Sequence, residues 1–165
     1  MSKGHVVFVA LVALLAVACG PSYNIKESKP TPQQILKPAI DLINRCSSDT
    51  SINTMAYKAS FDTVGTKLVV FLGKSVESYE YKWEVPLKLI DKTNLVLFRQ
   101  DYNVSSITLS TYGSQNGVKY YMDRRFKSNS PQFVLYLGKC FSSEEKEQVL
   151  QKLVEAITVS QIDQK

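Results

Sequence analysis

The sequence predicts an α+β fold: about seven antiparallel strands, as a barrel or a sandwich, flanked by an N-terminal helix and a C-terminal amphipathic helix. Three observations lead to this prediction. Apolar and polar side chains alternate through the middle of the chain, from about residue 51 to 138. Turn-forming residues separate these segments at short intervals. The two stretches that flank this region carry apolar residues at helical spacing instead.

The first helix is expected just after residue 30. Thr31-Pro32-Gln33-Gln34 has the form of a helix start, with a threonine cap, a proline at the first helical position and a glutamine that completes a capping box. Pro38 conflicts with this, because a proline inside a helix removes a hydrogen bond and clashes with the preceding turn. The helix therefore kinks at Pro38 or begins near it. Its apolar face consists of Ile35, Leu36, Ala39, Ile40 and Ile43.

Seven segments have the character of strands. The clearest is Tyr79–Val85, in which aromatic and charged residues alternate strictly. Turns are expected at Val64-Gly65, at 91–94 and at Asn116-Gly117, a pair typical of tight hairpins. In order, the segments are Met55–Phe61, Lys67–Leu72, Tyr79–Val85, Leu95–Phe98, Ile107–Leu109, Val118–Met122 and Phe133–Leu137.

A last helix is predicted from Ser142-Ser143-Glu144-Glu145, which combines a capping box with acidic residues in the first turn. Strands followed by one amphipathic helix have an order that resembles a pleckstrin-homology-like barrel, over about residues 52–158. That resemblance implies a closed barrel with the helix at an open end, and a role in binding rather than catalysis.

The N-terminus has the features of an export signal. Lys3 and His5 precede thirteen apolar residues, 6–18, which is too short to span a membrane as a helix and suits a signal peptide. The stretch Leu15–Cys19 resembles the bacterial lipobox, although Ala16 stands where leucine is usual. The resemblance implies that residues 1–18 are a signal peptide and that Cys19 is acylated, for example with palmitate.

The expected signal peptide and acylation site determine the expected organisation of the chain. Residues 19–31 form a lipid-anchored tether, and residues 32–160 form one globular domain. Gly20 is not the aspartate that retains lipoproteins at the inner membrane, so the resemblance implies the outer membrane, facing the periplasm or the cell surface. Two alternatives stay open: secretion without a lipid, and an uncleaved membrane anchor.

The cysteine count follows from the same interpretation. The chain has three cysteines, and an odd number in an exported protein needs an explanation. If Cys19 carries a lipid, Cys46 and Cys140 remain and can form a disulfide in an oxidising periplasm. The alternative is two separate buried thiols.

Few catalytic designs suit this composition. His5 is the single histidine and lies in the expected signal peptide, so the mature chain has no Ser-His-Asp triad and no imidazole metal site. Ser143 and Lys146 fit S-x-x-K, Glu80 and Glu84 could form a carboxylate pair, and Asp91, Asp101 and Asp123 could bind calcium. A helix cap, a charged outer face and isolated surface acids explain them better, so we expect no enzyme, cofactor or metal. The net charge of +5 is scattered, which argues against nucleic-acid binding.

The aromatic residues are the remaining candidates. Tyr79, Tyr81, Trp83 and Tyr121 could form a partner or ligand surface; the alternative is that they pack in the core. We therefore expect a non-catalytic envelope lipoprotein that binds a protein or another envelope component. The second hypothesis is a carrier of a lipid or small apolar ligand inside a barrel, with a cavity lined by Leu97, Leu109, Met122 and Leu135. An enzyme of unusual design is the third.

Overall fold

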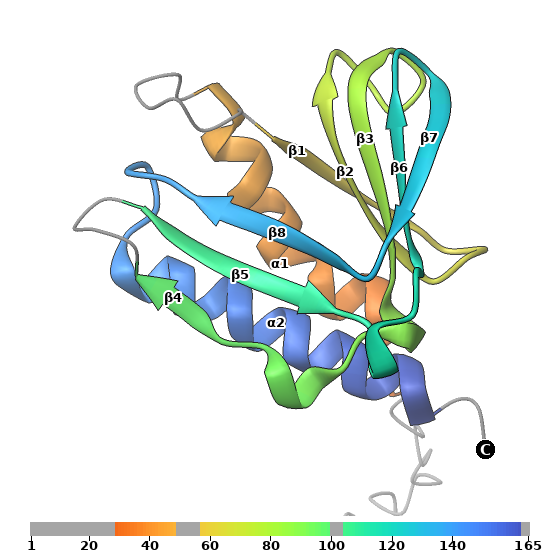
Figure 1. Ribbon diagram of the computed structural model, residues 1–165. Helices are drawn as coiled ribbons and strands as arrows, with labels where there is room; N and C mark the ends of the chain where they lie inside the picture. The colour runs from red at the N-terminus through yellow and green to blue at the C-terminus, as the bar shows by residue number, and fades with distance from the viewer. Residues whose placement is uncertain (1–28, 49–56, 100–103, 163–165) are drawn as a thin grey trace, which may run out of the picture.

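Two helices lie side by side against two antiparallel sheets in the computed structural model, which describes residues 29–48, 57–99 and 104–162 (Figure 1). The helices are α1 (Pro32–Arg45) and α2 (Ser143–Ile162). The larger sheet has the strand order β1-β2-β3-β6-β7, and the smaller one has the order β4-β5-β8. The strands are β1 (Lys58–Asp62), β2 (Lys67–Gly73), β3 (Tyr79–Pro86), β4 (Leu97–Arg99), β5 (Ser105–Ser110), β6 (Val118–Met122), β7 (Arg125–Ser130) and β8 (Gln132–Leu137). The predicted α+β class is confirmed.

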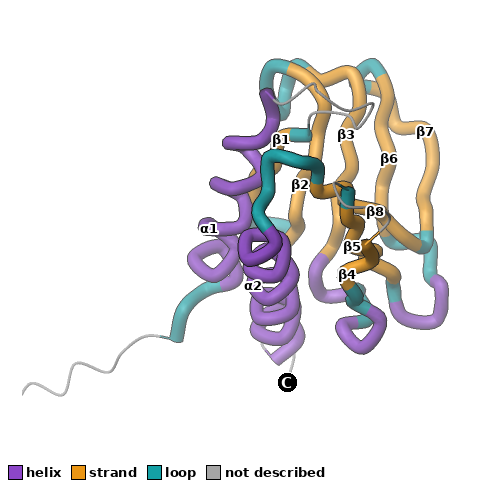
Figure 2. The backbone as a smooth tube through the Cα atoms, turned by 90° about the vertical axis from the view of Figure 1, so that its left-hand side faces the viewer, coloured by secondary structure: helices purple, strands orange, loops and turns teal. Residues whose placement is uncertain are grey.

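The described strands form two open sheets, so of the two predicted alternatives the closed barrel is wrong, and the arrangement is sandwich-like. β1 and β7 are the outer strands of one sheet, and β4 and β8 are those of the other. Figure 2 shows α2 beside α1 on one side of the strands, not at the end of a barrel as the pleckstrin-homology-like order implied. In a closed barrel, one helix can bury its apolar side against the open end. Here two amphipathic helices must both bury their apolar sides, and an open sheet provides a face large enough for both.

One hydrophobic core joins all of these layers. Side chains from α1, α2 and both sheets are buried in it together. The fully buried large side chains are Leu36, Leu68, Leu87, Ile90, Ile107, Leu109, Leu135, Leu137, Leu153, Ile157, Val70 and Val85. The layers therefore share one interior. In Figure 1 the upper part of the larger sheet extends above the smaller sheet.

Helix α1 begins where its capping box predicts. The Thr31 hydroxyl accepts from the Gln34 N–H at 3.3 Å, and the Gln34 side chain accepts from the Thr31 N–H at 2.8 Å. Pro38 lies inside the helix and is exposed, so its ring faces away from the core. The alternative in which the helix starts near Pro38 is wrong, because the cap and Pro32 already define a start six residues earlier.

Helix α2 also begins at its predicted cap. The Ser142 hydroxyl accepts from the Glu145 N–H at 3.2 Å, and Glu145 Oε2 accepts from the Ser142 N–H at 2.9 Å. Just before this helix, Cys140 is bonded to Cys46, with Cα atoms 5.8 Å apart. The predicted disulfide is confirmed, and it ties the end of α1 to the segment that leads into α2.

All seven predicted strands are present, and an eighth, β7, was not predicted. β7 has the sequence Arg-Phe-Lys-Ser-Asn-Ser and is almost entirely exposed, so it lacks the apolar alternation that marks a half-buried strand. It follows β6 through a two-residue turn, Asp123-Arg124, in which both residues have positive φ (49° and 62°). Such turns match the twist of a hairpin but usually contain glycine or asparagine. The sequence Asp123-Arg124 contains neither, so it did not indicate a hairpin.

The hairpin predicted at Asn116-Gly117 is wrong. β5 and β6, which flank this pair, belong to different sheets. Gly117 is not among the residues with positive φ, and its N–H donates to the Gln115 carbonyl at 2.8 Å. A Cβ on Gly117 would lie 3.0 Å from the Leu89 side chain and 3.2 Å from that of Thr111, so close packing, rather than turn geometry, accounts for the glycine here.

Several predictions concern residues outside the described part of the chain. The signal peptide at 1–18, the acylation site Cys19 and most of the tether are among them, as are Met55 and Asp101.

Candidate functional site

A β-bulge in β3 divides the predicted aromatic residues between the two faces of the larger sheet. Leu72 pairs with Tyr81 and Gly73 pairs with Tyr79, so Glu80 is an extra residue in β3. Because side chains alternate in a strand, this extra residue turns Tyr79 to the face opposite Tyr81 and Trp83. Two of the four predicted surface residues therefore lie on each face.

Tyr81 and Trp83 belong to an inner aromatic cluster that continues the core. We define this cluster as Tyr57, Tyr81, Trp83, Tyr120 and Phe133. The Trp83 ring stacks on Tyr120 with centroids 5.4 Å apart, and it lies 5.5 Å from Phe133 of β8. Burial raises the pKa of Tyr57, and the nearby Tyr136 adds to this shift. The cluster joins the two sheets through Trp83 and Phe133. Trp83 packs against the core, which is the alternative expected for it, whereas Tyr81 is half-buried beside it.

Tyr79 and Tyr121 belong to the opposite face, where they form an outer aromatic patch with Phe126 around Lys82. The Lys82 ammonium lies 4.3 Å from the Tyr121 ring centroid and 4.9 Å from that of Tyr79, within range of a cation–π interaction. The Phe126 ring contacts Tyr121 edge-on at 5.8 Å and is 53% exposed. An accessible aromatic side chain beside tyrosines is typical of protein interfaces.

A network of charges holds this patch in place. Glu84 accepts from Lys82 at 3.0 Å through one oxygen and from Lys67 at 3.1 Å through the other. The side chains of Lys82 and Glu84 are only 14% and 16% exposed. Burial alone would raise the pKa of Glu84, but hydrogen bonds from Lys82 and Lys67 outweigh it, so that the pKa lies below its ordinary value. Glu84 is therefore ionised, and it fixes the position of Lys82 within the patch.

The β6–β7 hairpin beside the patch carries several basic residues. It carries four cations and one carboxylate, a net charge of +3, and all five side chains are exposed. These residues are Lys119, Asp123, Arg124, Arg125 and Lys127. Sequence reasoning missed this feature because it depends on β7, and the single apolar residue Phe126 in a polar stretch is the one sign that could have indicated it.

The remaining catalytic and metal candidates have structural roles or stand apart. Ser142 and Glu145 form the α2 cap, while Ser143 is exposed and Lys146 is buried. Asp91 accepts from the Thr93 N–H at 3.0 Å and caps a short turn. Among the described residues, no three His, Cys, Asp or Glu side chains gather as a metal site would require.

The four residues predicted to line a carrier cavity do not share one. Leu97, Leu109 and Leu135 lie on one face of the smaller sheet; Leu109 and Leu135 are fully buried in the core, and Leu97 packs against it. Met122 lies in the larger sheet, paired with Tyr81 on one side and Arg125 on the other. The carrier hypothesis therefore gains no support from these positions.

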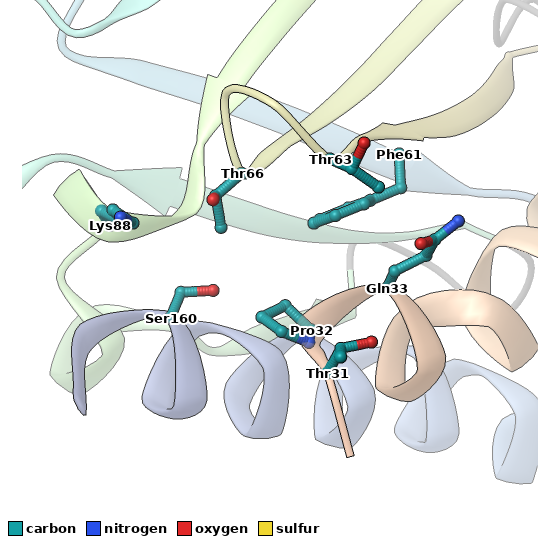
Figure 3. A pocket seen from close by; sticks show the side chains of 8 residues that line it. All are labelled: Thr31, Pro32, Gln33, Phe61, Thr63, Thr66, Lys88 and Ser160. Atoms are coloured by element: carbon teal, nitrogen blue, oxygen red, sulfur yellow. The ribbon is translucent and has the colours of Figure 1, made fainter. Parts of the chain in front are cut away.

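A shallow depression of about 240 Å³ lies at the start of α1 (Figure 3). Two of its hydroxyl groups are already engaged, because Thr31 accepts in the α1 cap and Ser160 donates to the Ala156 carbonyl at 2.7 Å. Its lining residues are Thr31, Pro32, Gln33, Phe61, Thr63, Thr66, Lys88 and Ser160. This set of residues does not define a ligand chemistry.

None of the helices in the described ranges has both the length and the apolar character needed to cross a bilayer. Comparisons of the chain with protein-family models, with curated proteins and with solved structures find no match.

Proposed function

We propose that this chain is a non-catalytic bacterial envelope lipoprotein, acylated at Cys19, that binds a partner protein through the outer aromatic patch. The observation that carries the proposal is the patch itself: three aromatic side chains lie around a half-buried, ion-paired lysine, on a face that no described helix covers. Interfaces concentrate their binding energy in such aromatic anchors, and a basic rim selects an acidic partner.

The position of the patch suits a tethered protein. In Figure 1 the turn between β6 and β7 lies at the top of the molecule. The start of α1 and the end of α2 lie toward the bottom. A chain anchored at Cys19 enters the fold at the start of α1. The twelve residues from Gly20 to Thr31 span at most about 40 Å. The patch therefore lies at the end of the fold opposite the point where the tether enters, and the tether is long enough to hold the fold clear of the lipid headgroups.

The absence of catalysis is part of the proposal and has its own support. Glu84 is paired with two lysines, and Ser143, the serine of the S-x-x-K pattern, is exposed whereas Lys146 is buried. A general acid needs a raised pKa, whereas the pKa of Glu84 is lowered.

The anchor is tested by mass spectrometry of the mature N-terminus and by metabolic labelling with palmitate. We expect an acylated Cys19 in the native chain, and loss of both the label and membrane association in Cys19→Ser. A mature chain that begins at another residue, or that retains its signal peptide, would contradict the proposed lipid anchor at Cys19.

The binding surface is tested by photo-crosslinking in intact cells. A photoreactive residue replaces Phe126 in one variant and Gln148, which is exposed on α2, in a matched control. We expect a discrete protein adduct from position 126 and none from position 148. Equal yields at both positions, or no protein adduct at 126, would count against the patch as the interface.

A further inference from the structure

The edges of the two sheets differ in how far they are closed. At β1, the Asn44 side chain donates to the Ala59 carbonyl at 2.9 Å and accepts from the Ala59 N–H at 2.7 Å, so it takes the place of a neighbouring strand. In the described part of the chain β4 has three residues, and β8 borders the larger sheet, where Phe133 packs on Trp83. Such devices protect sheet edges from pairing with other chains.

β7 is the edge that stays open. It is six residues long, five of them are exposed, and among the described strands it pairs with β6 alone. In an antiparallel pair, alternate residues direct their N–H and C=O groups toward the partner. Lys127 is an extra residue at a β-bulge opposite Tyr120 and Tyr121, and on either side of it alternate β7 peptide groups point away from the sheet. An extended peptide can pair with these groups and add a strand.

The charge of this edge restricts what can pair with it. Arg125 and Lys127 lie in β7, and Arg124 precedes it in the turn. A second copy of β7 would bring its own cations against these, and like charges on adjacent strands are destabilising. An incoming strand with carboxylates at the same positions would form ion pairs instead, so the charge of this edge favours an acidic segment over a second copy of β7.

Phe126 adds an apolar contact beside these charges. It pairs with Tyr121 across the hairpin, and its ring contacts that of Tyr121 on the outer face. A residue directly opposite Phe126 on a new strand would have its Cβ about 4.5–5.5 Å away, close enough for an aliphatic or aromatic side chain to cover the exposed ring.

We propose that β7 is the docking edge for an extended acidic segment of the partner protein, which adds to the larger sheet as a sixth strand. The inference rests on the proposed function, since it assigns the chemistry of the partner that the outer aromatic patch binds. Main-chain hydrogen bonds supply the affinity, and Arg125, Lys127 and Phe126 supply the selectivity.

The experiment uses the purified chain with its disulfide intact and two blocked six-residue peptides, one alternating glutamate and valine, the other alternating lysine and valine. Binding is followed by NMR, and strand addition by amide hydrogen exchange. We expect the glutamate peptide to bind and to protect alternate β7 amides, including that of Phe126. The lysine peptide should bind at least about tenfold more weakly, because each ion pair becomes a like-charge contact.

A charge-swapped variant makes the test reciprocal. Arg125→Glu combined with Lys127→Glu should reverse the preference, so that the lysine peptide binds and the glutamate peptide does not. The matched control, Lys92→Glu with Lys139→Glu, changes the net charge equally at exposed positions away from β7 and should keep the original preference. Unchanged melting temperatures establish that both double variants fold.

Three results would overturn the docking edge: no protection of β7 amides by the glutamate peptide, an unchanged preference in the charge-swapped variant, or concentration-dependent protection of β7 without any peptide, which indicates a second copy. The proposed function can fail independently. In that case position 126 yields no protein adduct in cells although the purified chain still adds the acidic strand at β7.

Discussion

Arg45 binds Glu145 through both ends of its guanidinium group, with Nη1–Oε1 and Nη2–Oε2 distances of 2.9 Å. The pair joins the last residue of α1 to the first turn of α2, beside the Cys46–Cys140 disulfide. The hydrogen bond from Arg45 is the main reason that the pKa of Glu145 falls from its ordinary value of 4.5 to about 2. Bidentate pairs of this kind fix the relative orientation of the groups that they join.

This pair predicts a specific pH dependence of stability. Because the folded-state pKa of Glu145 is the lower one, its contribution is fully present above pH 4.5 and is lost as the pH falls through about 2. Glu145→Gln should therefore flatten the decline of the urea midpoint over this range. The effect should be small, since both side chains are partly exposed. Glu147→Gln, on the exposed face of the same helix, is the control, and an identical slope in both variants would refute the assignment.

The disulfide should contribute much more to stability than this ion pair. It connects residues 94 positions apart, so it restricts most of the unfolded chain. Replacing both Cys46 and Cys140 by serine should lower the free energy of unfolding by about 4 kcal/mol in the chain-entropy model. Urea denaturation of the oxidised chain, the reduced chain and the double variant measures this. The reduced chain and the double variant should agree, and a reduced chain as stable as the oxidised one would contradict the prediction.

Asn44 should stabilise the β1 edge specifically. Asn44→Ala removes two hydrogen bonds to Ala59 and should cost about 1–3 kcal/mol, because the freed backbone groups are partly buried. The Ala59 amide should also exchange faster with solvent. Gln148→Ala, an exposed change on α2, should alter neither quantity. Normal protection of Ala59 in the Asn44 variant would show that another group closes this edge.

The two faces of β3 should respond differently to truncation. Trp83→Ala removes the centre of the inner aromatic cluster and should destabilise the fold by about 3 kcal/mol or more. Phe126→Ala, in the outer aromatic patch, should change stability by less than about 0.5 kcal/mol while abolishing partner binding. Thermal melts and crosslinking yields separate the two effects. A strongly destabilised Phe126 variant would make the patch a structural element instead.

Lys82 should control the ionisation of Glu84. Lys82→Met keeps the aliphatic contact with the tyrosine rings but removes the ammonium group, so Glu84 retains Lys67 as its charged partner. The pKa of Glu84 should rise, and stability should fall by about 2–4 kcal/mol, the sum expected for a charge-assisted hydrogen bond and a cation–π contact. Carbon-detected NMR titration of the carboxyl group measures the first effect. Lys92→Met should leave Glu84 unchanged.

The sequence was most informative where local chemistry determines structure. Both capping boxes, at Thr31 and Ser142, mark where their helices begin, and the period-two pattern from Tyr81 to Val85 indicates a strand with a buried face. Each of these signals depends on residues a few positions apart. The disulfide was predictable from counting cysteines, given the expected acylation of Cys19.

The features that were missed depend on pairing between distant segments. β7 is an edge strand with little apolar surface, so nothing in its own residues distinguishes it from a loop. The side on which Tyr79 lies depends on the register between β2 and β3, which the composition of β3 does not encode. The Asn116-Gly117 pair shows the reverse error, because packing against Leu89 selects glycine there without a hairpin.

The extra residue at Glu80 has a consequence for how this surface can change. Removing it would carry Tyr79 across to the side of Tyr81, without replacing any aromatic side chain. The outer patch would lose one of its rings and the inner cluster would have to accommodate another. Point substitutions at Glu80 would leave the register intact, so this surface is sensitive to a one-residue deletion at a position where side-chain exchange should be tolerated.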